Sequence, residues 1–270
     1  SRRRHTRSST VSWARRFVNP KFHTLYGTDP MGITAENLAE LYNISRADQD
    51  LFAFNSQQKA AKAQQNGVLA QEICPVTIPQ RKGDSIIVDR DEFIRPDTTL
   101  EKLALLKPVF KKDGSVTAGN ASGLNDGAAA MLIASEDALK KYSLRPKVRI
   151  LTSAVVGVEP KIMGIGPVYA TQKALEKAGL TLDDMQVMEF NEAFSAQALA
   201  CTRLLGIADD DPRINPNGGA IALGHPLGMS GTRILQAATN ELVRSGGRFA
   251  LATMCVGVGM GYAVILENIT

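Results

Sequence analysis

Cysteine, tryptophan and histidine are scarce in this sequence of 270 residues, which has three cysteines, one tryptophan and three histidines. Three scattered cysteines are too few for a disulfide framework, and without a Cys-x-x-Cys pair the common zinc motifs are excluded. No apolar run approaches the roughly 18–20 residues that a membrane-spanning helix needs. No Gly-x-Gly-x-x-Gly motif follows a predicted strand, so there is no nicotinamide or flavin fingerprint. We therefore expect a cytoplasmic protein with reduced thiols, no membrane segment, no metal and no permanently bound cofactor.

Acidic residues are missing from the first sixteen positions, which carry six arginines. The whole chain has 31 Lys and Arg against 27 Asp and Glu, a net charge of +4. Without those six arginines, 25 basic residues face 27 acidic ones, and the net charge becomes −2. The body of the protein is thus mildly acidic, and its charge gives no argument for nucleic-acid binding.

The first half of the chain has helical spacing followed by short strands and loops. Residues 34–67 predict helices, with Thr34 and Ser45 as candidate N-caps and Asp48 completing a capping box with Ser45. Short strands are predicted over 74–79 and 85–92, and an exposed loop over 93–114. The small and apolar residues 128–135, AAAMLIAS, predict a buried strand.

From Pro146 onward, strands and helices alternate. The predicted strands cover 147–157, 186–190, 248–254 and 261–267, and the predicted helices cover 168–179, 193–206 and 230–247. Ser230 is a candidate N-cap of the last helix. This alternation, closed by a glycine-rich hairpin, predicts an α/β layered domain with a mixed sheet.

Three residues in glycine-rich or turn-forming frames are the candidates for chemistry. His225 lies in NPNGGAIALGHPLGMSGTR, where the glycines let the backbone approach a ligand closely. Cys255 begins CVGVGMG at a strand end, where amide N–H groups can converge on an oxyanion. Asn191 follows the strand QVMEF, so it either faces a ligand crevice or caps the next helix. The other cysteines, Cys74 and Cys201, are predicted to be packing residues.

These frames together resemble the thiolase family, over nearly the whole chain from about Arg16 to the C-terminus. The resemblance is carried by TAENLAE, ISRADQDLFA, TAGNASGLNDGAAA, GVEPKIMGIGP, NEAF, NPNGGAIALGHPLGMSG and CVGVGMG. The active loops, with LGIADDDPRINPNGG, are most similar to those of the 3-oxoadipyl-CoA thiolases of aromatic-compound catabolism.

The resemblance implies a layered αβαβα fold of two similar halves, and a ping-pong thiolytic cleavage of a 3-ketoacyl-CoA. It implies that His225 activates a cysteine nucleophile, that Asn191 fixes a water in an oxyanion hole, that Cys255 moves the α-carbon proton and that Gly257 donates an N–H to a second hole. CoA is implied as co-substrate, and a dimer or tetramer as the assembly. The residues implied to line the CoA and acyl sites are Ser122, Arg95, Leu106, Phe110, Met163 and Phe194.

On this resemblance only part of the thiolase fold is expected. The implied division is an aberrant basic tail (1–16), a loop or lid domain (17–120), a remnant of the N-terminal half-domain (121–145) and the C-terminal domain (146–270). The half that carries the nucleophilic cysteine is not found. The chain is therefore expected to be a truncated thiolase, and the alternative is a non-catalytic fragment that binds CoA or an intact subunit.

Two further alternatives concern the tail and the reaction. Residues 1–16 fit a targeting presequence, a basic arm for an anionic surface, or foreign sequence from a frame shift or fusion. We favour foreign sequence, because the resemblance begins in the interior of a fold and not ahead of one. Ketoacyl-synthase-like condensation shares the fold but needs a second histidine where Cys255 stands, so it ranks below the thiolase interpretation.

Overall fold

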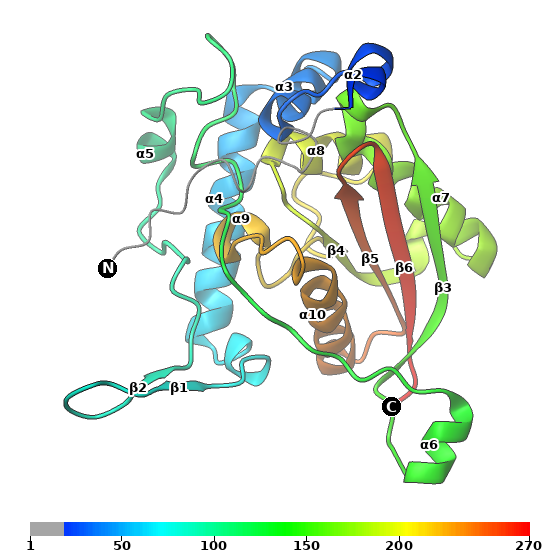
Figure 1. Ribbon diagram of the computed structural model, residues 1–270. Coiled ribbons are helices and arrows are strands. Elements are labelled where there is room, and N and C mark those ends of the chain that lie inside the picture. Colours follow the sequence, from blue (N-terminus) through cyan, green and yellow to red (C-terminus); the bar gives the residue numbers. More distant parts are fainter. Residues whose placement is uncertain (1–18) are drawn as a thin grey trace.

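The computed structural model describes residues 19–270. An α/β body formed by the second half of the chain lies beside a mainly helical region formed by the first half (Figure 1). The basic segment 1–16 lies outside the described residues. Within the described part, no helix is both long and apolar enough to cross a membrane.

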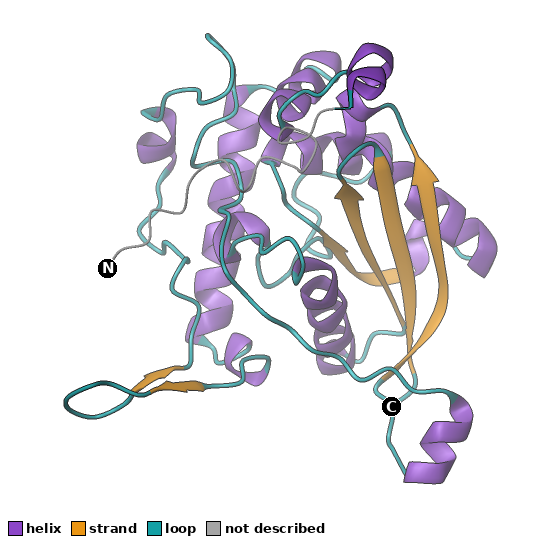
Figure 2. Ribbon diagram, viewed as in Figure 1, coloured by secondary structure: helices purple, strands orange, loops and turns teal. Residues whose placement is uncertain are grey.

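The body is built on a four-stranded mixed sheet in the order β3-β6-β5-β4 (Figure 2). Strands β4 and β5 are parallel, whereas β6 pairs antiparallel with both β5 and β3. The strands are β3 (Val148–Gly157), β4 (Met185–Phe190), β5 (Phe249–Val256) and β6 (Met260–Asn268). The mixed sheet predicted from the strand–helix alternation is confirmed.

Helices cover both faces of this sheet because side chains alternate along each strand. In β4, Val187 packs into a cluster with Ile234 and Leu242 of α10 (Ser230–Ser245), on one face. Its neighbour Met188 packs on the other face, into the larger cluster formed with α7 and α8. The remaining elements of the body are η2 (Pro160–Ile165), α7 (Gly166–Ala178), η3 (Leu182–Asp184), α8 (Ser195–Leu204) and α9 (Ala220–Leu223).

The helical region packs on α8 and α9 through two helices, α3 (Met31–Leu41) and α4 (Arg46–Gln65). Ser45 and Asp48 form the predicted capping box at the start of α4. Thr34, in contrast, is not an N-cap, because it lies inside α3 and its hydroxyl donates to Met31 O. The other elements here are α2 (Pro20–Tyr26), η1 (Leu69–Gln71), β1 (Val76–Ile78), β2 (Ile86–Val88) and α5 (Leu100–Ala104).

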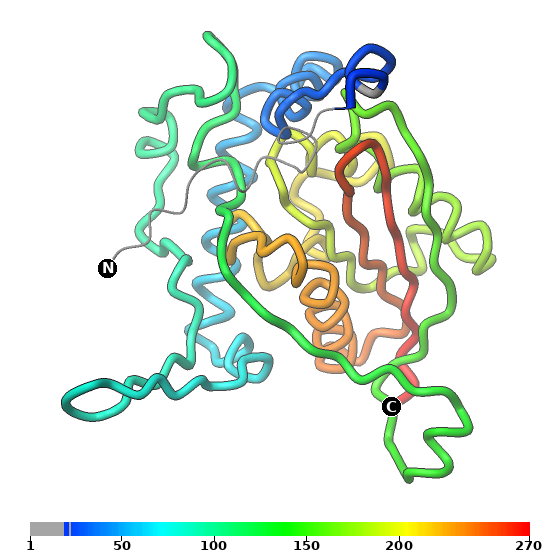
Figure 3. Tube along the Cα trace, in the orientation of Figure 1, coloured from blue at the N-terminus to red at the C-terminus, as the bar shows by residue number. Residues whose placement is uncertain are grey.

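The strand predicted over residues 128–135 is wrong. The segment runs as an extended loop past α10 to α6 (Glu136–Tyr142), as Figure 3 shows. It is mostly exposed, and residues 124–134 make no backbone hydrogen bond with any other described residue. The apolar pattern is that of a strand, but among the described residues 19–270 no strand lies beside it to pair with it.

Two smaller expectations also fail. Ser230 is not a capping residue: Met229 occupies the N-cap of α10, and the Ser230 hydroxyl makes other contacts. Cys74 is exposed and lies outside the strands, so it is not a packing residue, whereas Cys201 is fully buried as predicted.

Candidate active site

His225 lies in a tight loop between α9 and α10. The preceding Gly224 has φ = 94°, and a Cβ there would lie 2.2 Å from Asn125 Oδ1, so only glycine fits. The backbone N–H of His225 donates to Gly123 O at 2.8 Å. The loop is thereby held against the segment that carries Ser122.

Hydrogen bonds to both ring nitrogens fix the proton on the neutral imidazole. The Ser230 hydroxyl donates to Pro226 O at 3.0 Å, so it accepts from His225 Nδ1 at 2.5 Å. The proton therefore sits on Nδ1, and Nε2 carries a free electron pair. The Asn191 side-chain amide lies 3.3 Å from Nε2 and donates to it. The candidate base thus presents Nε2 towards Asn191.

Burial keeps this imidazole neutral. Desolvation, assisted by the charge of Arg233, lowers the pKa of His225 from about 6.5 to about 4. At neutral pH the ring is therefore a proton acceptor. Sequence reasoning placed His225 at the centre of the site but treated Ser230 as a helix cap. A hydroxyl five residues after a glycine-framed histidine was the available signal.

Asn191 is completely buried directly beyond β4, and it is not a helix cap because α8 starts at Ser195 with Phe194 as N-cap. Its backbone N–H donates to Thr253 O at 3.0 Å, which continues the parallel pairing of β4 with β5. Its Oδ1 is buried and has no hydrogen-bond partner in the 19–270 region. The carboxamide therefore has one oxygen available to a donor beside the imidazole.

Cys255 lies near the end of β5, two residues beyond the Thr253 that pairs with Asn191. The thiol is buried, and desolvation raises its pKa to about 12. At neutral pH it therefore holds its proton. Since β4 and β5 are parallel, the protonated thiol near the end of β5 lies at the same end of the sheet as Asn191, which contacts the neutral imidazole.

The turn after Cys255 is strained. Val258 has φ = 75°, a conformation that β-branched residues rarely adopt. The turn is held by the bond from Val158 N to Gly259 O at 2.7 Å. Gly257 is half-buried next to Cys255, with open space where a Cβ would stand. Strain of this kind persists where the surroundings over-determine a backbone conformation, as at many functional sites.

The residues implied for CoA and acyl binding are partly brought together. Phe110 and Phe194 form an edge-to-face pair with ring centroids 6.1 Å apart. Ser122 donates both its hydroxyl and its N–H to Ala193 O, each at 3.0 Å, next to Asn191 and Phe194. Met163 is buried within η2.

Arg95 and Leu106 lie further along the helical region. The Arg95 guanidinium stacks 5.7 Å from the Phe93 ring, and a Cβ on Gly123 would touch that ring. Arg95 thus contacts Phe93, and the Phe93 ring in turn lies against Gly123, next to Ser122. Leu106 is partly exposed beside Gly119, and its carbonyl accepts from Arg46.

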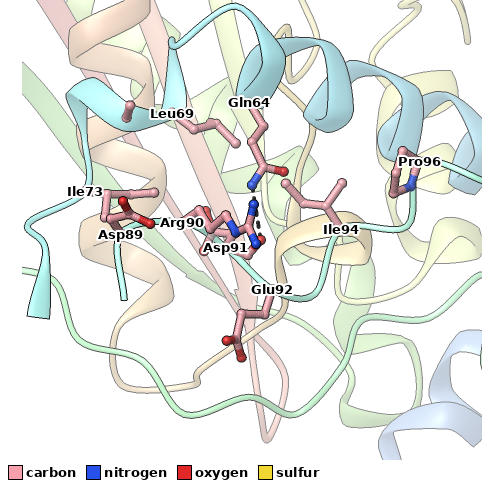
Figure 4. Close-up of a pocket in the computed structure, with 10 residues that line it drawn as sticks. Gln64, Leu69, Ile73, Asp89, Arg90, Asp91, Glu92, Ile94 and Pro96 are labelled. Carbon is pink, nitrogen blue, oxygen red and sulfur yellow. Dashed lines mark hydrogen bonds between the residues drawn. The ribbon is translucent and has the colours of Figure 1, made fainter. Parts of the chain in front are cut away.

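A depression lies beside residues 89–96 (Figure 4). Residues 92, 94 and 96 line it, together with Gln64 and the start of η1, whereas Phe93 and Arg95 do not. Gln64 bridges the two sides by donating to Asp91 O. No group of three or more His, Cys, Asp or Glu within residues 19–270 is placed to hold a metal ion.

A buried carboxylate, Glu192, was missed in the sequence. It follows Asn191 and accepts hydrogen bonds from Ser56 and Asn215 side chains and from Ile221 N. An acidic residue at the end of a buried apolar strand was the signal. Fold and site together define an α/β protein whose neutral imidazole and protonated thiol suit proton transfer at a carbonyl compound.

The comparisons with known proteins agree with that class. The chain matches two family models, "Thiolase, N-terminal domain" over residues 3–137 and "Thiolase, C-terminal domain" over residues 144–268. The chain belongs to the thiolase family. The first match begins at residue 3 and so includes most of the basic segment.

Its curated relatives include a "Beta-ketoadipyl-CoA thiolase" of Acinetobacter baylyi, 59% identical over 261 residues, with 97% of this chain and 65% of the relative covered. A "3-oxoadipyl-CoA/3-oxo-5,6-dehydrosuberyl-CoA thiolase" of Escherichia coli is 56% identical over 269 residues, with 100% of this chain and 67% of the relative covered. The chain thus spans about two thirds of the length of these relatives.

Solved structures show the same partial coverage. The acetyl-CoA acetyltransferase of Bacillus anthracis matches with a TM-score of 0.86 and 47% identity, over 90% of this chain and 61% of its own. Human mitochondrial 3-ketoacyl-CoA thiolase in complex with CoA matches with a TM-score of 0.85 and 50% identity, over 90% and 60%. The α/β thiolase fold is therefore present in part.

Proposed function

We propose that this chain carries the acid–base half of a thiolase that cleaves a 3-ketoacyl-CoA such as 3-oxoadipyl-CoA. In the proposed ping-pong reaction, a cysteine attacks the 3-keto carbon, an acyl-CoA leaves and CoA resolves the acyl-enzyme. The relatives named for beta-ketoadipyl-CoA support this substrate class. The nucleophile is assigned to polypeptide other than these 270 residues.

The observation that carries the proposal is the chain of contacts Ser230–His225–Asn191, at the same end of the sheet as Cys255. In our assignment, His225 Nε2 takes the proton of the nucleophile and then donates to the oxyanion together with a donor held by Asn191. Cys255 exchanges a proton with the α-carbon, and Gly257 N–H binds the second oxyanion. Placed proton transfer of this kind contributes roughly 10²–10⁴-fold.

The CoA side of the proposal rests on contacts near Asn191. Ser122 is assigned to the pantetheine arm, Arg95 to the nucleotide end, and Leu106 and Phe110 to the channel. Met163 and Phe194 are assigned to the acyl pocket. The human relative in complex with CoA supports CoA as co-substrate.

The domain division that we propose is a lid (17–120), a remnant of the first half-domain (121–145) and the C-terminal domain (146–270). In a complete thiolase these parts would belong to a five-layered αβαβα core, assembled as a dimer or tetramer.

Proton exchange tests the acid–base half without needing a nucleophile. The purified chain is incubated with acetyl-CoA in D₂O, and deuterium in the acetyl group is followed by mass spectrometry. We expect incorporation above the background rate, loss of it in Cys255→Ser, and no change in the matched control Cys74→Ser. Exchange that is the same with and without the chain would contradict the proposal.

A second experiment addresses the nucleophile. Intact-protein mass spectrometry after mixing with 3-oxoadipyl-CoA is expected to show no acyl adduct. An adduct that disappears when CoA is added would mean that one of the three cysteines is the nucleophile, and the division of labour proposed above would be wrong.

A second candidate function is binding to another thiolase polypeptide without catalysis. The observation that favours it is the extended segment 124–134, in which Leu132 and Ile133 are 79% and 68% exposed. Unpaired backbone and apolar side chains form a template for strand addition. We expect the chain to co-elute with a full-length thiolase, and Leu132→Lys with Ile133→Lys to abolish co-elution. Elution as a free monomer at micromolar concentration would exclude this candidate.

A further inference from the structure

Glu192 is the most heavily hydrogen-bonded carboxylate near the site, and it lies at the meeting point of three segments. Its Oε2 accepts from Ser56 Oγ of α4 at 2.6 Å and from Ile221 N of α9 at 3.2 Å. Its Oε1 accepts from Asn215 Nδ2 at 2.7 Å. Only 1% of the residue is exposed, so water does not compete for these bonds.

The partners of Glu192 are themselves tied to the strand end and to the histidine loop. Asn215 bonds both the N–H and the C=O of Phe190, at 2.8 and 2.9 Å, and so anchors the end of β4. Ser56 Oγ accepts from Gly219 N at 3.2 Å, at the N-cap of α9. A Cβ on Gly219 would lie 2.2 Å from the carboxyl carbon, so the loop sits directly on Glu192.

Two of the three segments, the β4 end and the α9 loop, lead directly to a residue of the candidate site. Asn191 immediately precedes Glu192, and Ile221 lies four residues before His225. The contact between the two, Asn191 Nδ2 to His225 Nε2, is 3.3 Å long, and Asn191 Oδ1 has no hydrogen-bond partner within residues 19–270 that would hold the carboxamide from its other side. Its length therefore depends on how the two backbones are spaced.

We propose that Glu192, together with Ser56, is a positioning residue that sets the spacing of Asn191 and His225 by fastening the β4 end and the α9 loop to α4. Glu192 itself does not reach the imidazole, and it acts through the two backbones. The inference rests on the proposed function only in treating Asn191 and His225 as the catalytic pair.

The hydrogen bonds require a side chain at position 192 that accepts at both of its terminal atoms. All three partners of Glu192 are donors, and a carboxylate accepts at both oxygens. In Glu192→Gln the amide NH₂ must face either Asn215 Nδ2 or the Ile221 N–H. In both orientations the NH₂ donor points at another hydrogen-bond donor and no bond can form. An isosteric change therefore forces one of the two segments to move, which costs more than a lost contact.

A matched control lies three residues earlier, inside β4. Glu189 is also completely buried, but neither of its carboxylate oxygens has a hydrogen-bond partner within residues 19–270. Glu189→Gln changes a buried acid in β4 without opposing donors in the two loops. It separates positioning from a general effect of replacing a buried carboxyl.

The readout is the ¹⁵N spectrum of the His225 ring in the full 270-residue chain, which needs no turnover. His225→Gln identifies its signals among those of the three histidines. In Glu192→Gln we expect the Nε2 resonance to move downfield, towards a nitrogen that has lost its donor, while Nδ1, held by Ser230, stays in place. Glu189→Gln should leave both resonances unchanged.

Ser56→Ala removes one donor and provides a second, milder variant. It should move Nε2 in the same direction by a smaller amount, and it decides the question if Glu192→Gln does not fold. An unchanged Nε2 resonance in a folded Glu192→Gln or Ser56→Ala variant would overturn the inference, as would an equal shift in Glu189→Gln. If the wild-type chain shows no proton exchange, the proposed function is contradicted. The effect of Glu192→Gln on the Nε2 resonance can still be measured, so the two failures are distinguishable.

Discussion

The strands of the body sheet and residues 128–134 are both apolar in sequence but have opposite surroundings. Leu251 in β5 is fully buried on the face of the sheet that α7 and α8 cover, whereas Leu132 is 79% exposed. Every strand of the body sheet is hydrogen-bonded to a neighbour, whereas residues 124–134 form no backbone hydrogen bond within the described part of the chain. Helix α6, which follows, has no buried residue.

An apolar pattern alone is therefore not sufficient to form a strand. A strand is stabilised by ladder bonds and by packing on both faces, and both depend on neighbours elsewhere in the fold. The body supplies these neighbours for β3 to β6, and the segment has none. Four measurements test whether the body is as tightly packed, and the segment as exposed, as the structure shows.

The largest effect is expected where the body is packed backbone to backbone. A Cβ on Gly261 would lie 2.0 Å from the backbone C and O of Gly166, at the first turn of α7. Gly261→Ala must separate β6 from α7, and we expect it to cost more than about 4 kcal/mol. Urea unfolding followed by circular dichroism measures this, with Gly257→Ala, which meets open space, as control. Equal midpoints for the two variants would show that the body is not tightly packed.

The two leucines test the comparison directly. Leu251→Ala should lower the free energy of unfolding by about 2–5 kcal/mol, because it leaves a cavity between the sheet and the helices α7 and α8. Leu132→Ala should change it by less than about 0.5 kcal/mol, because the side chain is already in water. A large loss in Leu132→Ala would mean that segment 124–134 is covered in solution, and sedimentation velocity would identify self-association.

The pH dependence of stability tests the burial of the site. The pKa of His225 is about 4 in the folded protein and about 6.5 when unfolded, so between these values the unfolded state binds the extra proton. The stability associated with a neutral His225 is therefore present above about pH 6.5 and is lost as the pH falls towards 4. At pH 5 the loss amounts to about 2 kcal/mol.

His225→Gln isolates this contribution from that of the carboxylates. The difference in unfolding free energy between wild type and variant should shift in favour of the variant as the pH falls from 7 to 5. A constant difference over that range would show that the imidazole is solvated and not held as a buried neutral base.

The smallest effects are expected at two serine N-caps. Ser45 caps α4, which packs on α8 and α9 of the body, and Ser135 caps the exposed helix α6. Ser45→Ala should cost about 1 kcal/mol of global stability. Ser135→Ala should leave global unfolding unchanged and speed amide exchange only within α6, because that helix opens on its own. Equal global losses would mean that α6 is docked in solution.

Much of the body was predictable because its signals are local. Short apolar runs predicted β3 to β6, the helical spacing of Ile234, Ala238 and Leu242 predicted α10, and α7 ends at Gly179, with φ = 66°, where the predicted helix 168–179 ends. The short strands β1 and β2 were predicted for the same reason. The helix caps predicted at Thr34 and Ser230 were wrong, because a hydroxyl that can cap a helix can also donate to a nearby backbone carbonyl.

The candidate groups of the site could be found without the structure, since a histidine and a cysteine framed by glycines are recognisable from their immediate neighbours in the chain. Only the tertiary structure decided that Ser230 holds the imidazole proton on Nδ1, that Asn191 faces Nε2, and that Glu192 joins α4 to both loops. It also decided that residues 128–135 have no strand beside them. The physical reason is the same in each case: these contacts join residues far apart in the chain, and their energy exists only once the fold has brought them together.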